Sequence, residues 1–215
     1  MVSVWGVDSA AKVTEELFQC VKDNFGTPKY WGRYLAEVEG VSDGLTKHEI
    51  QYIRSRGMKL LPIYNVFDNA VGYEKGRVIA RNAVYHARRL GLPKDKVIFA
   101  NVERFFDVDE AFIRGWVDSI FTTGYRPGIY HDPIEGGFAS AYCEAVQKNP
   151  QVATQAILWS AEPETGVSTE RKAPRFDPAS PPCKANVWAW QYGRDADACP
   201  IDTVLADRKL MQYLY

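Results

Sequence analysis

The chain has 215 residues, of which 46% are hydrophobic, 25% charged and 13% aromatic, a composition that excludes disordered and collagen-like proteins. Its formal net charge of −1 provides no long-range attraction to nucleic acid or anionic lipid. The chain begins MVSVWGVDSA, without a basic leader, and it has no apolar stretch of about 18 residues. We therefore expect no signal peptide, no membrane span and no nucleic-acid partner.

Short apolar runs alternate with longer amphipathic segments, a pattern typical of strands connected by helices. Strands are predicted at 2–7, 29–35, 58–64, 97–102, 128–130, 154–160, 186–192 and around 199–202. Helices are predicted at 14–25, 46–57, 74–90, 112–120 and 137–148, with a terminal helix that contains Leu205, Leu210, Met211 and Leu214. Thr46 and Glu49 have the spacing of a helix capping box.

The stretch 161–182 contains five of the twelve prolines and is predicted to be one long loop. Strands that alternate with helices in a chain of this length predict an α/β fold, a single (β/α)8 TIM-like barrel over 1–215 with some short or irregular helices. An open, doubly wound sheet is the alternative. It loses support because the chain has neither a G-x-G-x-x-G nor a G-x-x-x-x-G-K-[ST] motif.

Polar residues stand where the predicted strands end. Asp8 ends the first run, and Asn101 and Glu103 end the fourth; the other such residues are His131, Asp132, Gln191 and Asp202. In a parallel barrel the carboxyl ends of the strands form one face, so these side chains should converge. Glu103 stands near Phe99, Phe105 and Phe106, whose burial could keep its carboxyl protonated, as a general acid requires.

Several short motifs resemble the Chalaropsis-type lysozymes of glycoside hydrolase family 25. These are WGVD at 5–8, GYRPGIY at 124–130, WAWQY at 188–192 followed by ID at 201–202, and the strand that ends in N-x-E where the family has an acid-x-Glu pattern. RYL at 33–35 and L-x-x-x-E at 45–49 also recur in less characterised glycoside-hydrolase-like relatives of those lysozymes. The resemblance implies a barrel that acts on cell-wall glycan such as peptidoglycan.

Carried over by position, the resemblance implies that Glu103 is the catalytic acid and that Asp8 and Asp202 belong to the catalytic site. Asn101 stands where active lysozymes have Asp, and Asn cannot act as a base or an anionic nucleophile, although it can hold an acetamido group or a water molecule. The predicted substrate-binding residues are Asn101, Arg33, Tyr64, Tyr130, Asp132, Trp159 and Gln191. One or two tryptophans at the mouth could also stack on sugar rings.

Each assignment has a structural alternative. Asp8 and Asp202 could cap helices, and Asn101 could be a buried side chain satisfied by the backbone. Glu103 could pair with Arg104 or Arg33. His131 beside Asp132 lacks the spacing of a metal motif, so we expect neither a metal nor a cofactor.

The cysteines bear on the compartment. Cys20 and Cys143 fall on predicted helices and are expected to be small buried apolar residues. Cys183 and Cys199 flank the seventh strand and could pair in an oxidising compartment. The lysozyme resemblance favours export, and we expect a monomer.

Three functions follow from these patterns. The first is hydrolysis of cell-wall glycan with Glu103 as proton donor and Asp8 and Asp202 as supporting carboxyls. The second, favoured by Asn101, is a glycan-binding or scaffold barrel without catalysis. The third is a metal-dependent hydrolase that uses Asp8, His131 and Asp202.

Overall fold

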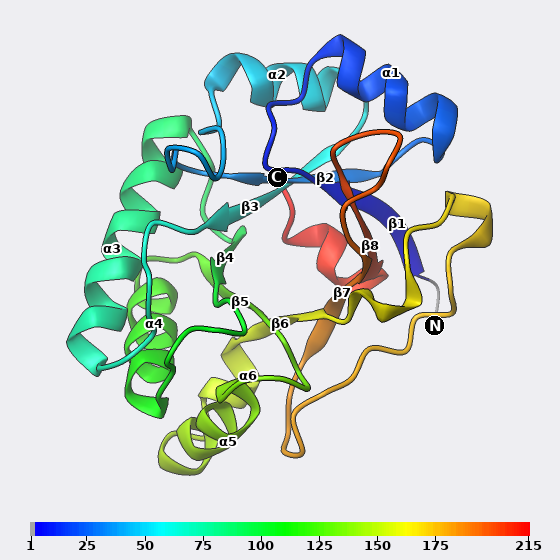
Figure 1. Ribbon diagram of the computed structural model, residues 1–215. Helices are drawn as coiled ribbons and strands as arrows, with labels where there is room; N and C mark the ends of the chain where they lie inside the picture. The colour runs from blue at the N-terminus through cyan, green and yellow to red at the C-terminus, as the bar shows by residue number, and fades with distance from the viewer. Residues whose placement is uncertain (1–2) are drawn as a thin grey trace.

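The structure, a computed structural model, describes residues 3–215, and its eight strands close into one barrel in the order β1 to β8 (Figure 1). The strands are β1 Ser3–Asp8, β2 Tyr30–Tyr34, β3 Lys59–Tyr64, β4 Val97–Asn101, β5 Arg126–His131, β6 Ile157–Ala161, β7 Val187–Gly193 and β8 Asp202–Asp207. Neighbouring strands from β1 to β7 are parallel. The predicted TIM-like barrel is confirmed.

The α-helices form an arc around the barrel (Figure 1). They are α1 Glu15–Asn24, α2 Lys47–Ser55, α3 Tyr73–Leu90, α4 Glu110–Thr122, α5 Phe138–Lys148 and α6 Val152–Gln155. Side chains cap three of them, since Thr14, Thr46 and Asp109 accept hydrogen bonds from backbone N–H groups of the first turn. The side without α-helices is covered by the long segment between β6 and β7, which contains only the 3-10 helices η1 (Pro163–Thr165) and η2 (Glu170–Lys172).

Alternation along the strands separates the core into two layers. Side chains such as Leu61, Phe99 and Val204 fill the barrel interior. The opposite faces of the strands pack under the helices. The 3-10 helix η3 (Arg208–Gln212) and the last residues close one end of the barrel, because Leu210 joins the interior cluster and Tyr215 pairs through its backbone with Leu60 near the start of β3. The opposite end of the barrel is therefore the end at which a functional site can lie.

The prediction for the chain after Gly193 was wrong in two respects. The last strand is not centred on 199–202, and the expected terminal helix is absent from its predicted span, because Leu205 lies in β8. β8 runs antiparallel to both β7 and β1. The connection 194–201 is too short for a crossover between parallel strands, which takes roughly a dozen residues or more. The chain must therefore turn back as a hairpin.

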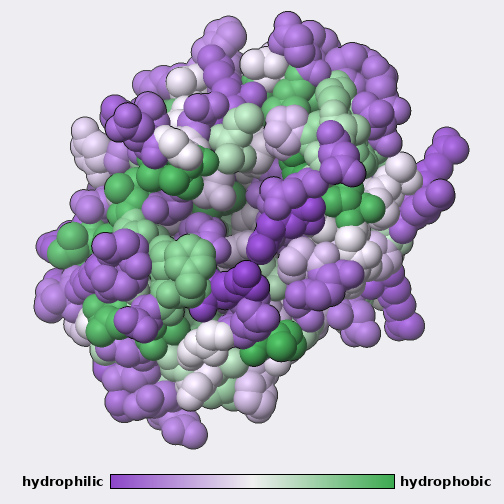
Figure 2. All heavy atoms as spheres, in the orientation of Figure 1, coloured by the Kyte–Doolittle hydropathy of each residue, from purple (hydrophilic) through white to green (hydrophobic). Residues whose placement is uncertain are grey.

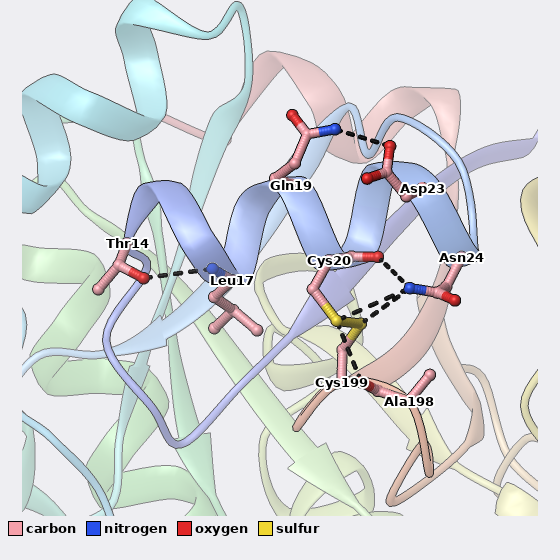
Figure 3. Close-up of a disulfide and its surroundings, with 8 residues drawn as sticks. All are labelled: Thr14, Leu17, Gln19, Cys20, Asp23, Asn24, Ala198 and Cys199. Carbon is pink, nitrogen blue, oxygen red and sulfur yellow. Dashed lines mark hydrogen bonds between the residues drawn. A yellow bond between two sulfur atoms is a disulfide. The ribbon is translucent and has the colours of Figure 1, made fainter.

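The cysteine prediction is also corrected. Cys20 of α1 bonds to Cys199 in the β7–β8 hairpin, and Cys143 of α5 bonds to Cys183 in the long loop (Figure 3 shows the first pair). The expected pairing of Cys183 with Cys199 is wrong, because each of them is bonded to a cysteine of a helix instead. Both disulfides fasten irregular segments that flank β7. Among residues 3–215, no helix is long and apolar enough to cross a membrane.

Candidate active site

A pocket of about 260 Å³ lies at the end of the barrel where β1 to β7 finish. In the orientation of Figure 1, the space-filling view shows hydrophilic side chains gathered near the centre of this face (Figure 2). The structure brings Asp8, Glu103 and Asp202 together in this pocket. The complete lining is Asp8, Tyr34, Ile63, Asn101, Glu103, Phe105, Tyr130, Trp159, Gln191, Arg194, Asp195 and Asp202.

Asp8 and Asp202 face each other across adjacent strands. Asp8 is the last residue of β1, and Asp202 is the first residue of the antiparallel β8, so the two form a register pair. On the other side of Asp8, a Cβ at Gly32 would lie 2.5 Å from the Asp8 Cβ. Gly32 therefore provides the space in which the Asp8 side chain sits. Asp202 is not a helix cap, because it begins a strand.

Gln191 of β7 joins these two carboxyl groups. Its Nε2 donates to Asp8 Oδ2 at 3.1 Å and to Asp202 Oδ2 at 2.9 Å. Burial raises the pKa of Asp8 well above its usual value, and the neighbouring charge of Asp202 adds to this effect. Burial likewise raises the pKa of Asp202 to about 6, against the opposing hydrogen bond from the Asp195 backbone. At neutral pH this side of the pocket therefore carries less negative charge than two free carboxylates would.

Asn101 and Glu103 form the opposite, shallower side. Asn101 ends β4, and its Nδ2 donates to Glu103 Oε1 at 2.9 Å. The side-chain amide of Asn101 therefore donates to another side chain and not to the backbone in this contact. The expected aromatic burial of Glu103 is wrong, because Glu103 is only half-buried and Phe105 is 76% exposed. The carboxyl group that burial affects most is instead Asp8.

Tyr130 and Trp159 form the floor of the pocket. Both are buried, with ring centroids 5.0 Å apart in an edge-to-face arrangement. Burial raises the pKa of Tyr130 well above its usual value, so its hydroxyl keeps its proton. That hydroxyl donates to Gln191 Oε1 at 2.8 Å. The indole of Trp159 is 1% exposed and presents no open face for a sugar.

The prediction that Arg33 contacts a substrate is wrong. Arg33 is completely buried, and its Nε bonds Glu49 Oε1 at 2.6 Å. Its other nitrogens donate to backbone carbonyl oxygens of Ser9, Ala10 and Asp43. The R-Y-L and L-x-x-x-E motifs therefore supply a structural ion pair, and the Glu49 side chain turns to Arg33 and the Val13 N–H.

Three other predicted residues lie outside the pocket lining. Tyr64 is 2% exposed and its ring lies beside His86 of α3, so its predicted substrate contact is also wrong. Asp132 accepts hydrogen bonds from the backbone of Ile134 and Glu135 and shapes the turn after β5. His131 is buried and stacked on Phe138. Among residues 3–215, no group of three or more potential ligands is placed to hold a metal ion, which removes the support for a metal-dependent hydrolase.

The sequence analysis missed several lining residues, of which Tyr34, Phe105 and Arg194 are the most distinctive. Arg194 follows β7 directly, and its Nη2 donates to the Tyr130 hydroxyl at 3.1 Å. The available signal was its position immediately beyond a strand that ends at the mouth. Tyr34 could have been found from strand alternation, since it shares the inner face of β2 with Tyr30.

The comparisons with known proteins agree with this geometry. The family model described as Rv2525c-like, glycoside hydrolase-like domain matches residues 27–198. An uncharacterized B. stearothermophilus protein is 63% identical, with a TM-score of 0.98 over 99% of this chain and 100% of that chain. No curated protein matches the chain.

More distant solved structures share the fold. A family GH25 lysozyme from Aspergillus fumigatus is 14% identical, with a TM-score of 0.62 over 98% of this chain and 97% of that chain. The modular autolysin LytC from Streptococcus pneumoniae, in complex with a synthetic peptidoglycan ligand, is 13% identical, with a TM-score of 0.61 over 94% of this chain and 46% of that chain. At these identities the likeness concerns the fold alone.

Proposed function

Since the chain belongs to the Rv2525c-like, glycoside hydrolase-like domain family, we propose that its pocket binds a cell-wall glycan such as peptidoglycan and hydrolyses a glycosidic bond with Glu103 as proton donor. The observation that carries this proposal is the convergence of three carboxyl groups in one pocket, with Asp8 buried and Glu103 and Asp202 half-buried. Glycosidases place two carboxyl groups on either side of the bond that they cleave.

The roles follow from the two sides of the pocket. Glu103 is half-buried and lines the pocket, so its carboxyl group is within reach of a bound glycan, as a general acid requires. Glu103 donates its proton to the leaving oxygen. Asp202, ionised above pH of about 6, stabilises positive charge on the sugar or orders the attacking water, and burial favours the neutral form of Asp8, which can donate a hydrogen bond. The carbonyl oxygen of Asn101 can accept from an acetamido N–H.

Two further observations support a cell-wall substrate. LytC, which shares the fold, was solved with a peptidoglycan ligand, and other neighbours are lysozymes. The two disulfides suit an oxidising compartment, which supports an exported or cell-wall-associated protein.

The test is the release of reducing ends from purified peptidoglycan by the wild type and by Glu103→Gln. We expect the variant to lose activity by roughly 100-fold or more, the contribution of a positioned general acid, while it still binds the glycan. Glu144→Gln on α5, outside the pocket, is the matched control and should keep full activity. Equal release by wild type and Glu103→Gln would exclude Glu103 as the acid.

The second candidate is a glycan-binding barrel without turnover. It is favoured by Asn101, whose Nδ2 donates to Glu103 Oε1, because an amide cannot act as a base or an anionic nucleophile beside that carboxyl group. Saturable glycan binding with no release of reducing ends by the wild type would support it. Appearance of turnover in Asn101→Asp would show that this one residue separates binding from hydrolysis.

A further inference from the structure

Three pocket residues, Arg194, Tyr130 and Gln191, form one hydrogen-bond chain that ends on the carboxyl groups of Asp8 and Asp202. Arg194 Nη2 donates to the Tyr130 hydroxyl at 3.1 Å, and Tyr130 donates to Gln191 Oε1 at 2.8 Å. Gln191 Nε2 then donates to Oδ2 of both Asp8 and Asp202. Three segments contribute, since Tyr130 lies on β5, Gln191 on β7 and Arg194 on the β7–β8 hairpin.

The direction of this chain is determined at Arg194. A guanidinium has five N–H donors and no acceptor, so Tyr130 must receive from it and has only its own proton to pass on. That proton occupies Gln191 Oε1, which forces the Nε2 hydrogens toward the carboxyl groups. Without Arg194, Gln191 Oε1 loses a nearby donor and the Tyr130 hydroxyl is no longer oriented by it, so Nε2 is held toward Asp8 and Asp202 less firmly.

We propose that Arg194 is a positioning residue that sets the polarity of this hydrogen-bond chain and so keeps the second carboxyl oxygen of Asp8 free for the substrate. The Asp8 Oδ2 is occupied by Gln191, so Oδ1 is the oxygen left for a ligand. Among residues 3–215, no hydrogen bond is made by this second oxygen, and Asp8 lines the pocket. The catalytic part of this inference rests on the proposed glycan hydrolysis.

The hairpin that contains Arg194 is held in place by its neighbours. It begins the β7–β8 hairpin, which the Cys20–Cys199 disulfide fastens to α1 (Figure 3). The next residue, Asp195, has a positive φ of 56° and donates its backbone N–H to Asp202 Oδ1 at 2.7 Å. Although Asp8, Glu103 and Asp202 line the same pocket, Arg194 forms no ion pair within residues 3–215, which leaves its remaining N–H groups for a ligand.

Three variants separate polarity from charge. Arg194→Met removes both, and Arg194→Lys keeps a donor-only cation. Tyr130→Phe keeps the charge of Arg194 but removes the shorter of its two links to Gln191, leaving only the 3.5 Å contact from Arg194 Nη2 to Gln191 Oε1. The carboxyl carbons of Asp8 and Asp202 are titrated by NMR in the free protein, so this measurement does not depend on activity. We expect the apparent pKa of Asp202 to rise by about one pH unit in Arg194→Met and in Tyr130→Phe, because Gln191 no longer donates to it reliably, and to stay near the wild-type value in Arg194→Lys. A wild-type titration curve in Tyr130→Phe would overturn the proposal.

Kinetics on peptidoglycan provide the second measurement. We expect kcat to fall about tenfold in Arg194→Met and in Tyr130→Phe with little change in KM, to recover in Arg194→Lys, and to fall no further in the double variant. Additive losses in the double variant would show that the two residues act separately. If the wild type releases no reducing ends, the proposed hydrolysis fails, and the titration alone decides whether Arg194 sets the polarity.

Discussion

Arg33 and Arg194 are two arginines of this barrel whose surroundings differ in every respect that matters for function. Arg33 is completely buried, and it bonds Glu49 and three backbone carbonyl groups. Arg194 is half-buried in the pocket and donates to the Tyr130 hydroxyl, with Gln191 Oε1 at a longer 3.5 Å. Both follow an aromatic residue and a glycine, WG at 31–32 and YG at 192–193, so the local sequence does not distinguish them.

The difference shows that unused hydrogen-bond capacity, more than proximity to an acid, marks the residue that can meet a ligand. The guanidinium of Arg33 donates hydrogen bonds to the loops after β1 and β2 and so holds those loops to the barrel. That of Arg194 retains donors that face a pocket. Each of the following experiments changes either the buried ion pair of Arg33 or the pocket that contains Arg194.

The largest effect is expected on the Arg33 side. Arg33→Met leaves Glu49 without its partner in the core, and Glu49→Gln leaves the guanidinium uncompensated. Because a buried charge without its partner is strongly unfavourable, each change should lower the free energy of unfolding by about 3–5 kcal/mol. Urea denaturation measures this loss.

The matched control is the exposed pair of Arg77 and Glu74 on α3. Arg77→Met should change the free energy of unfolding by no more than about 0.5 kcal/mol, since exposed pairs are screened by water. A similarly small loss in Arg33→Met would contradict the structural role assigned to Arg33.

An intermediate effect is expected at Asp202, on the side of Arg194. Its pKa is raised from 3.8 to about 6 in the folded chain, so folding favours the protonated form. The stability that this group contributes is fully present below pH 3.8 and is lost as the pH rises through 6. Asp202→Asn should remove this loss, which amounts to at most about 3 kcal/mol.

Denaturation at several pH values between 4 and 8 tests this expectation. The stability of Asp202→Asn relative to the wild type should rise across that range, whereas the exposed Asp177→Asn should show no such trend. A difference that stays constant with pH would mean that burial does not hold the proton on Asp202.

The fold could be predicted because strand-like and helix-like periods alternate regularly as far as β7. The direction of β8 depends on the length of one connection. That connection was already short in the predicted elements, since only 193–198 separates the strands expected at 186–192 and around 199–202. The disulfides could not be derived from spacing, since their pairing depends on which helix lies over which loop. The pocket position of three carboxyl groups could be predicted without knowing which side of the barrel wall a residue faces, because their residues lie at strand ends. These residues are Asp8, Glu103 and Asp202.

The errors at the site arise because the sequence analysis did not determine which side of the barrel wall each strand residue faces. Arg33 and Tyr34 are neighbours on β2, and alternation sends them to opposite sides of the barrel wall. The same choice separates Tyr64 from Ile63, which is the residue of β3 that lines the pocket. A register set by the inner cluster would have selected Tyr34 and Ile63. Arg194 lies in a hairpin, where no such periodicity exists.

The smallest effect concerns the aromatic residues, to which the same criterion of free surface applies. Trp159 is 1% exposed, whereas Phe105 lines the pocket and is 76% exposed, so Phe105 is the ring with a face available for a sugar. Phe105→Ala should weaken glycan binding about fivefold, equivalent to about 1 kcal/mol, and leave the stability unchanged. Phe121→Ala on α4, outside the pocket lining, is the matched control and should bind as the wild type does. Calorimetric titration with soluble glycan fragments measures the affinity of both variants. If Phe105→Ala binds as tightly as the wild type, Phe105 is not the side chain that stacks on the sugar.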